Sequence, residues 1–233
     1  MDEGIDRDRS GAFGAQMTPN GTYANSLDVN NQGRRAYARL PAMPAFLLEE
    51  PYDEEGSDGN GVNGDATQPV GRFQWWGMLS NIGGYISGNG YLWPFNAGWQ
   101  NHLNTQGAQD MARLNAFVRS IAWNNLVPSG MGVIPTLVVG NAPPTADNYV
   151  AAAATLDGTL LVAYVPPAHT GSVTIDITAM SGPTRARWFD PTTTAYVDAG
   201  VGLLPSGTAI QAFIPPGGNG IGFADWVLLL EKQ

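Results

Sequence analysis

Residues 44–53 read PAFLLEEPYD, a short apolar run that ends on two adjacent carboxylates, Glu49 and Glu50. A run of this length between turn residues is typical of a strand covered on both faces, as in a parallel sheet. Burying an ionised carboxylate without a partner costs free energy, so strands rarely end in this way without a reason. The strand therefore either emerges into water here or directs one glutamate into a site.

The sequence on both sides of this strand predicts a mixed α/β region. A short helix is expected within residues 26–40, and Pro69 suits the first turn of a helix that runs to about residue 81. A glycine- and aromatic-rich strand and loop follow this helix. A further helix is expected over residues 108–123, because its apolar side chains recur on one face: Met111, Leu114, Phe117, Val118 and Ile121.

From about residue 130 the pattern changes to short strand-like runs separated by turn residues such as Asp157-Gly158 and Asp190-Pro191. Several short strands at this spacing indicate an antiparallel β-sandwich. We therefore expect residues 1–130 to form an α/β domain and residues 131–233 a β-sandwich domain. The expected strands are residues 134–140, 148–156, 159–166, 172–180, 185–190, 195–200, 209–215 and 225–232.

The composition excludes several classes of partner and of catalytic chemistry. The net charge of −9 argues against nucleic acids and anionic membranes as partners, whereas a neutral polar ligand such as a sugar is compatible with it. Cysteine is absent, which excludes disulfides, thiolate catalysis and zinc–sulfur sites. No apolar run has the length that spans a membrane. The first ten residues, MDEGIDRDRS, show no secretory signal.

Two groups of residues resemble a known family. Residues 44–56 (PAFLLEEPYDEEG), 72–99 and 122–129 (AWNNLVPS) resemble the C-terminal part of the catalytic barrel of apiosidase-like glycoside hydrolases. Residues 185–200 (RARWFDPTTTAYVDAG), 213–218 and 225–233 resemble the small β-sandwich that follows this barrel, a collagen-binding domain of collagenase type. The resemblance covers residue 26 to the end. It implies the C-terminal portion of a (β/α)8-type barrel followed by an antiparallel β-sandwich.

The resemblance also implies a catalytic residue. In this family the nucleophile is a glutamate at the C-terminal end of the seventh barrel strand, and it directly follows a proline and four mostly apolar or small residues. Aligned without a gap, Pro44 takes the proline position and Glu49 that of the nucleophile, while Tyr52 and Asp53 match the tyrosine and acid that follow. A shift of one residue would place Glu50 there instead, directly before Pro51.

Two departures from the family pattern limit this assignment. The family's barrel has six earlier strands, one of which carries the general acid, and the chain has no room for them before Glu49. Ordinary glycoside hydrolysis needs both carboxylates. The family's eighth strand carries a histidine and a tyrosine, where this chain has GGYISG and Tyr85 alone. The chain is thus expected to be a fragment or a reduced relative, with self-association or a partner chain covering the open barrel edge.

Aromatic side chains gather shortly after this presumed eighth strand. Trp76 is expected to pack in the core, but Trp93 lies in a loop that would face the site of a barrel. We therefore predict that Trp93, Tyr85, Tyr52 and Asp53 contact substrate. The acidic loop of residues 53–65 is expected to be solvated, since Val62 breaks the calcium-binding pattern. His102 and His169 have no metal-ligand spacing, so neither a metal nor a cofactor is expected.

Three functions remain open from the sequence. The first is a glycoside hydrolase-related protein of the retaining type, active if further upstream sequence supplies the acid. The second is a non-catalytic carbohydrate-binding module. The third is a structural protein of an extracellular filament or virion. A low content of charged residues and many Gly, Thr and Asn residues would suit assembly of this kind. An extracellular location is expected in each case.

Overall fold

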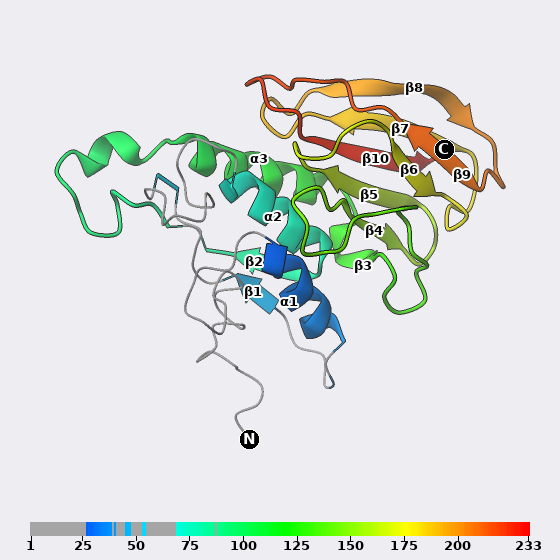
Figure 1. Cartoon of the computed structure of the whole chain (residues 1–233), viewed down its shortest axis with the longest axis horizontal. Helices are drawn as coiled ribbons and strands as arrows, with labels where there is room; N and C mark the ends of the chain where they lie inside the picture. The colour runs from blue at the N-terminus through cyan, green and yellow to red at the C-terminus, as the bar shows by residue number, and fades with distance from the viewer. Residues whose placement is uncertain (1–26, 39, 41–44, 48–52, 55–68, 87) are drawn as a thin grey trace. The chain divides into compact units, whose positions relative to one another are not determined.

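The computed structural model of the chain describes residues 27–38, 40, 45–47, 53–54, 69–86 and 88–233 (Figure 1). The chain divides into two compact units, unit 1 (residues 1–112) and unit 2 (residues 113–233). The division falls within helix α3 (Gln106–Ser120). It precedes the domain boundary placed at about residue 130 from the sequence, which stays a prediction. In the described part of the chain, none of the helices has the length and apolarity needed to cross a membrane.

Unit 1 is built around two parallel strands and the helix that connects them. Strand β1 (Ala45–Leu47) pairs with β2 (Ile82–Tyr85), with Ala45 opposite Ile82 and Leu47 opposite Tyr85. Parallel neighbours need a crossover connection, and helix α2 (Pro69–Leu79) provides it. Helix α1 (Leu27–Tyr37) precedes β1, and a 3-10 helix, η2 (Trp99–His102), precedes α3. The helices and strands expected here from the sequence are confirmed.

Helix α2 forms the centre of unit 1 because its aromatic side chains are buried. Phe73 and Trp76 are completely inaccessible to solvent, and Trp75 and Leu79 are nearly so. Helix α1 lies close to the end of α2, where the Ser80 hydroxyl donates a hydrogen bond to Asn30 Oδ1 at 2.8 Å. Gly33 permits this approach, since a Cβ atom there would collide with the Ser80 carbonyl oxygen and lie 2.8 Å from the Ser80 Cβ.

The Gly33→Ala variant is therefore expected to be destabilised by about 1–3 kcal/mol, the usual effect of overpacking a close contact. Alanine normally stabilises a helix interior relative to glycine by about 0.5–1 kcal/mol, so the sign of the effect is diagnostic. The matched control is Gly77→Ala in α2, where the new Cβ would meet nothing closer than 3.5 Å. Urea denaturation of both variants checks the prediction, and equal stability of the two would contradict it.

Unit 2 contains two antiparallel sheets. Six strands pair in the order β3-β4-β5-β10-β7-β8, and β6 pairs with β9 in a second, two-stranded sheet. Figure 1 shows β10 in the interior of the larger sheet, between β5 and β7. The strands are β3 (Leu126–Pro128), β4 (Ala151–Thr155), β5 (Leu160–Val165), β6 (Val173–Asp176), β7 (Thr184–Phe189), β8 (Tyr196–Leu204), β9 (Ile210–Phe213) and β10 (Trp226–Lys232).

The core of unit 2 lies on the central strands. Every residue of β4 and β5 is buried, as are the first five residues of β10. Strands covered on both faces read as continuous apolar runs, which explains the sequences AAAAT, LLVAYV and WVLLL. The C-terminal half of α3 adds to this core, because Phe117 packs on Phe189 of β7 with 4.7 Å between ring centroids.

Two expectations for unit 2 were wrong in detail. Residues 134–140 were expected to form a strand, but the structure has only an isolated bridge between Val138 and Ile175. Residues 126–128 were not expected to form a strand, whereas they form β3. Pro128 is tolerated there because β3 lies at the edge of the sheet, where a strand residue without an N–H leaves no ladder bond unmade. Helix α3 ends at Ser120 and is followed by the 3-10 helix η3 (Trp123–Asn125).

One buried carboxylate fixes the turn after β7. Asp190 is 3% exposed and accepts hydrogen bonds from the Thr192 backbone N (2.7 Å), the Thr192 hydroxyl (2.6 Å) and the Thr193 backbone N (3.2 Å). Its second oxygen accepts from the backbone N of Gly220 at 2.9 Å, thirty residues away. Asp190 therefore ties the β7–β8 turn to the loop before β10.

Candidate functional site

The candidate site lies beyond the carboxyl ends of β1 and β2, where the chain following each strand pairs once more. Asp53 and Asn89 form an isolated parallel bridge. The Asp53 backbone N donates to the Gly88 carbonyl at 3.0 Å, and the Gly90 N donates to the Asp53 carbonyl at 2.8 Å. The two loops are thus held side by side. In open α/β sheets, ligands bind outside the carboxyl ends of the strands.

Asn89 organises the turn after β2. Its Oδ1 accepts from the backbone N of Tyr91 (2.8 Å) and of Leu92 (3.2 Å), while its carbonyl accepts from the Trp93 N at 3.0 Å. Its Nδ2 donates to Glu54 Oε2 at 3.0 Å. Asn89 is 5% exposed, and both polar atoms of its side-chain amide make hydrogen bonds that hold neighbouring residues in place.

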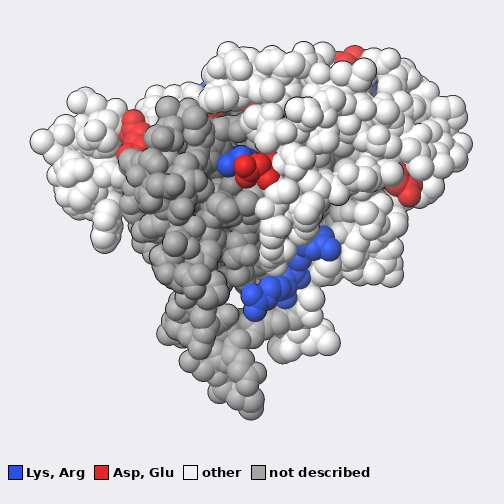
Figure 2. Space-filling view, in the orientation of Figure 1, with Lys and Arg blue, Asp and Glu red and all other residues white. Residues whose placement is uncertain are grey.

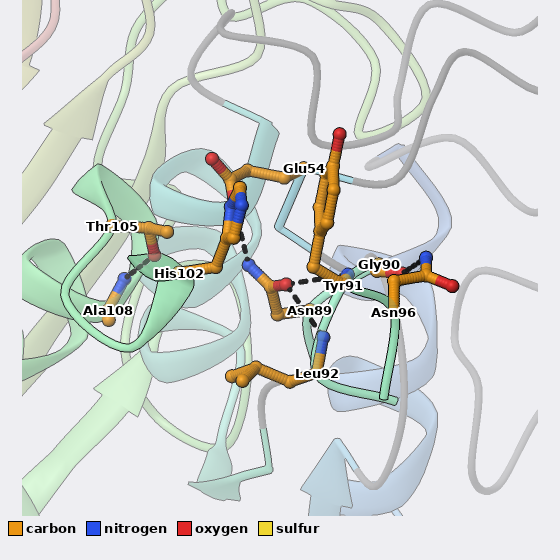
Figure 3. Close-up of polar contacts among 9 residues, drawn as sticks. All are labelled: Glu54, Asn89, Gly90, Tyr91, Leu92, Asn96, His102, Thr105 and Ala108. Carbon is orange, nitrogen blue, oxygen red and sulfur yellow. Dashed lines mark hydrogen bonds and ion pairs between the residues drawn. The ribbon is translucent and has the colours of Figure 1, made fainter. Parts of the chain in front are cut away.

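Glu54 is directed at this turn by an unusual backbone. Its φ of 55° lies in the left-handed region, which costs free energy for a residue with a side chain. Besides its bond with Asn89, the Glu54 Oε2 atom makes a hydrogen bond of 2.6 Å with His102 Nδ1. The His102 ring stacks on Tyr91, with 3.8 Å between centroids and 3° between planes (Figure 3). We call Glu54, Asn89, Tyr91 and His102 the Glu54 cluster.

An aromatic loop, residues 91–99, continues from this cluster towards solvent. Trp93 is 70% exposed and Phe95 73% exposed, while Phe95 packs edge-on against Trp99 at 5.8 Å. Phe95 also has a positive φ of 53°, so the loop carries strain at an exposed aromatic residue. Grouped exposed aromatic side chains of this kind mark interaction sites more often than scattered single ones do.

The Asp53 carboxyl group lies at the start of α3, next to Thr105 and Gly107. Burial raises the pKa of its carboxyl group above the ordinary value, and the Glu54 charge adds to this, against hydrogen bonds from Thr105 and the Gly107 backbone. A Cβ atom at Gly107 would lie 2.6 Å from the Asp53 Cγ, so the absent side chain makes room for the carboxyl group. Thr105 also caps α3, accepting from the Ala108 N at 3.3 Å (Figure 3).

The residues predicted from the sequence are partly brought together. Glu49, its alternative Glu50, and Tyr52 lie outside the described residues. Asp53 and Trp93 both contact Asn89 through the backbone, Asp53 by the parallel bridge and Trp93 by a hydrogen bond to the Asn89 carbonyl. Tyr85 is the last residue of β2 and is half-buried. Their substrate contacts stay predictions. Sequence reasoning missed Glu54, which was assigned to a solvated loop, and His102, which was weighed only as a metal ligand. Among the described residues, no three His, Asp or Glu side chains are grouped as metal ligands.

Comparison with known proteins supports a likeness to glycoside hydrolases. Residues 135–231 match the family model described as "Putative collagen-binding domain of a collagenase". A solved structure described as "Glycoside hydrolase" is similar with a TM-score of 0.71 and 18% identity, over 95% of this chain and 50% of that one. A glycoside hydrolase family 5 structure from Bacteroides vulgatus ATCC 8482 has a TM-score of 0.70 and 18% identity, over 88% of this chain and 45% of that one.

These likenesses define the class of fold: a mixed α/β chain, mostly of antiparallel sheet, similar to solved glycoside hydrolases. At 18% identity they show the fold alone. The chain spans about half the length of the two solved structures that it resembles. No curated protein matches it.

Proposed function

We propose that this chain is the carbohydrate-handling part of a glycoside hydrolase-related protein, with its ligand at the carboxyl ends of β1 and β2. One observation carries the proposal: the Glu54 cluster and the exposed Trp93 share one turn beyond the ends of two parallel strands. A sugar ring presents hydroxyl groups beside apolar C–H faces. It therefore fits a site in which a few fixed polar groups lie next to an aromatic surface.

The charge of the chain favours a neutral sugar. The chain carries a net charge of −9, and Glu54 lies within the cluster itself, so an anionic ligand would meet repulsion. On the face shown in Figure 2, charged side chains occupy only small separate areas and most of the described surface is neutral. Recognition there depends on hydroxyl hydrogen bonding and ring stacking rather than on ion pairs.

Catalysis is the finer part of the proposal and needs a second carboxylate. The resemblance implies Glu49 as the nucleophile, and retaining hydrolysis also requires a proton donor. In the described residues the parallel sheet of unit 1 has two strands, β1 and β2. We propose that further strands, from upstream sequence or a partner chain, complete this sheet as a barrel and supply the acid. The half coverage of both solved glycoside hydrolases supports this.

Affinity electrophoresis and a hydrolysis assay test the proposal together. The chain is run through native gels containing xyloglucan, galactomannan, arabinan or β-glucan, and incubated with 4-nitrophenyl glucoside, galactoside, xyloside and arabinofuranoside. We expect retardation by at least one polysaccharide. Any turnover should be lost in Glu49→Gln and kept in the matched control Glu50→Gln. Retardation without turnover is the result expected where the acid comes from further strands, and it leaves the binding part of the proposal standing. Neither retardation nor turnover would contradict the proposal.

A further inference from the structure

We propose that His102 is a hydroxyl-recognition residue of this site, held by Glu54 so that its Nε2 binds a hydroxyl group of a neutral sugar. The inference rests on the proposed function and names the group that contacts the ligand. The observation behind the inference is the 2.6 Å hydrogen bond between Glu54 Oε2 and His102 Nδ1, two residues that lie 48 positions apart in the sequence.

The first step concerns the proton on the ring. A carboxylate has only acceptor capacity, so the hydrogen of this bond must be on His102 Nδ1. In the neutral imidazole the other nitrogen, Nε2, is then an acceptor, because the bond made by one nitrogen sets the state of the other. Among the described residues, no hydrogen bond to Nε2 is present. A sugar hydroxyl can donate to it, and can equally accept from it when the ring is protonated.

The second step concerns the orientation of the ring. Two contacts fix it: the Glu54 carboxylate at Nδ1 and the parallel face of Tyr91 at 3.8 Å. Both partners are themselves anchored by Asn89, whose Nδ2 donates to Glu54 (3.0 Å) and whose Oδ1 accepts from the Tyr91 N (2.8 Å) (Figure 3). Holding a side chain in its bound orientation beforehand lowers the entropic cost of binding.

The third step concerns access. The His102 side chain is 24% exposed and the Glu54 side chain 35% exposed, so both are partly accessible to solvent. Trp93 is 70% exposed and belongs to the same turn as Tyr91. A ligand at this place would meet an aromatic face and a fixed nitrogen together. This combination suits the C–H face and the hydroxyl groups of one sugar ring.

Nitrogen NMR tests the role of Glu54 without any ligand. The chain has only two histidines, so a long-range ¹H–¹⁵N spectrum of the imidazole rings is assigned by the signals that disappear in His102→Gln. We expect His102 to carry its proton on Nδ1 in the neutral ring. This state should be lost in Glu54→Leu, which leaves Nδ1 without an acceptor. An Nε2-protonated ring in the unaltered chain would overturn the assignment.

Affinity electrophoresis in the polysaccharide gels tests recognition. We expect His102→Ala to bind about three- to tenfold more weakly, the usual effect of one hydrogen bond. His169→Ala in unit 2 is the matched control and should bind as the unaltered chain does. Circular dichroism verifies that both variants are folded. If the chain binds and His102→Ala binds equally well, this inference is overturned while the proposed function stands; if the chain binds no polysaccharide, both fail.

Discussion

The Asp190→Asn variant is expected to lose about 2–4 kcal/mol of unfolding free energy at pH 7. Asp190 is nearly fully buried and accepts from three backbone N–H groups and one hydroxyl. Hydrogen bonds to a charged group contribute about 1.5–3 kcal/mol each, and a buried donor left without its acceptor adds a further cost. An asparagine keeps the shape but replaces one acceptor oxygen by a donor NH₂ group, which would face donors in the same place.

The effect should depend on pH with a definite sign. Burial alone would raise the pKa of Asp190, but the hydrogen bonds from Thr192, Thr193 and Gly220 outweigh it and lower the pKa below its ordinary 3.8. The folded protein therefore binds this proton more weakly than the unfolded chain does. The stabilisation is complete above pH 3.8 and is lost as the pH falls through the lowered pKa. The difference between Asp190→Asn and the unaltered chain should shrink in that range.

Urea denaturation at pH 7 and at pH 3 measures both the loss of unfolding free energy in Asp190→Asn and its decrease at low pH. The matched control is Asp157→Asn. Asp157 also accepts from the hydroxyl groups of Thr155 (2.6 Å) and Thr159 (2.7 Å) and from the Thr159 backbone N (3.1 Å), and these bonds likewise lower its pKa. Asp157 lies in an exposed turn, where water replaces a lost partner, so we expect a clearly smaller loss. Equal losses in the two variants would show that burial of the Asp190 network does not matter for stability.

Trp93→Ala is expected to weaken polysaccharide binding by about 30-fold or more and to leave the melting temperature almost unchanged. Tryptophan side chains at the centre of a binding surface commonly contribute about 2 kcal/mol or more. The indole is 70% exposed, so truncating it removes little of the packing of unit 1. Loss of binding without loss of stability therefore separates a ligand contact from a core residue.

The control for this variant is Trp123→Ala, which removes a 41% exposed tryptophan from η3 in unit 2. Affinity electrophoresis in the gel that retards the unaltered chain most strongly measures both variants. We expect Trp123→Ala to bind as the unaltered chain does. Binding that survives Trp93→Ala but is lost in Trp123→Ala would move the ligand away from the aromatic loop.

Elements with strong local signals could be predicted from the sequence. Pro69 marked the start of α2, and short apolar runs bounded by turn residues predicted the strands β4, β5 and β10. The apolar face of α3 gave its length to within a few residues. Strand β3 was not predicted because it has only three residues and ends in a proline. Proline indicates a turn unless the strand is known to lie at the edge of a sheet.

The site was less predictable because its contacts are long-range. Nothing near Glu54 in the sequence indicates that it bonds a histidine 48 residues later, or that an asparagine 35 residues later holds the same oxygen. The prediction of Trp93 rested on its place in a loop after a strand, and the structure leaves that side chain exposed. Asp53 was grouped with the ligand contacts, which stays a prediction. Its packing against α3, which the absence of a side chain at Gly107 permits, could not be foreseen from the sequence.

The central claim is that a neutral sugar binds beyond the ends of β1 and β2, between Trp93 and His102. A ¹H–¹⁵N NMR titration with an oligosaccharide of the retained polysaccharide tests it most directly, with the Trp93 indole and His102 ring signals assigned by their loss in Trp93→Ala and His102→Gln. We predict that both signals shift together, with one affinity, while those of Trp123 and His169 stay in place. Saturable shifts confined to Trp123, His169 or other residues of unit 2 would contradict the claim.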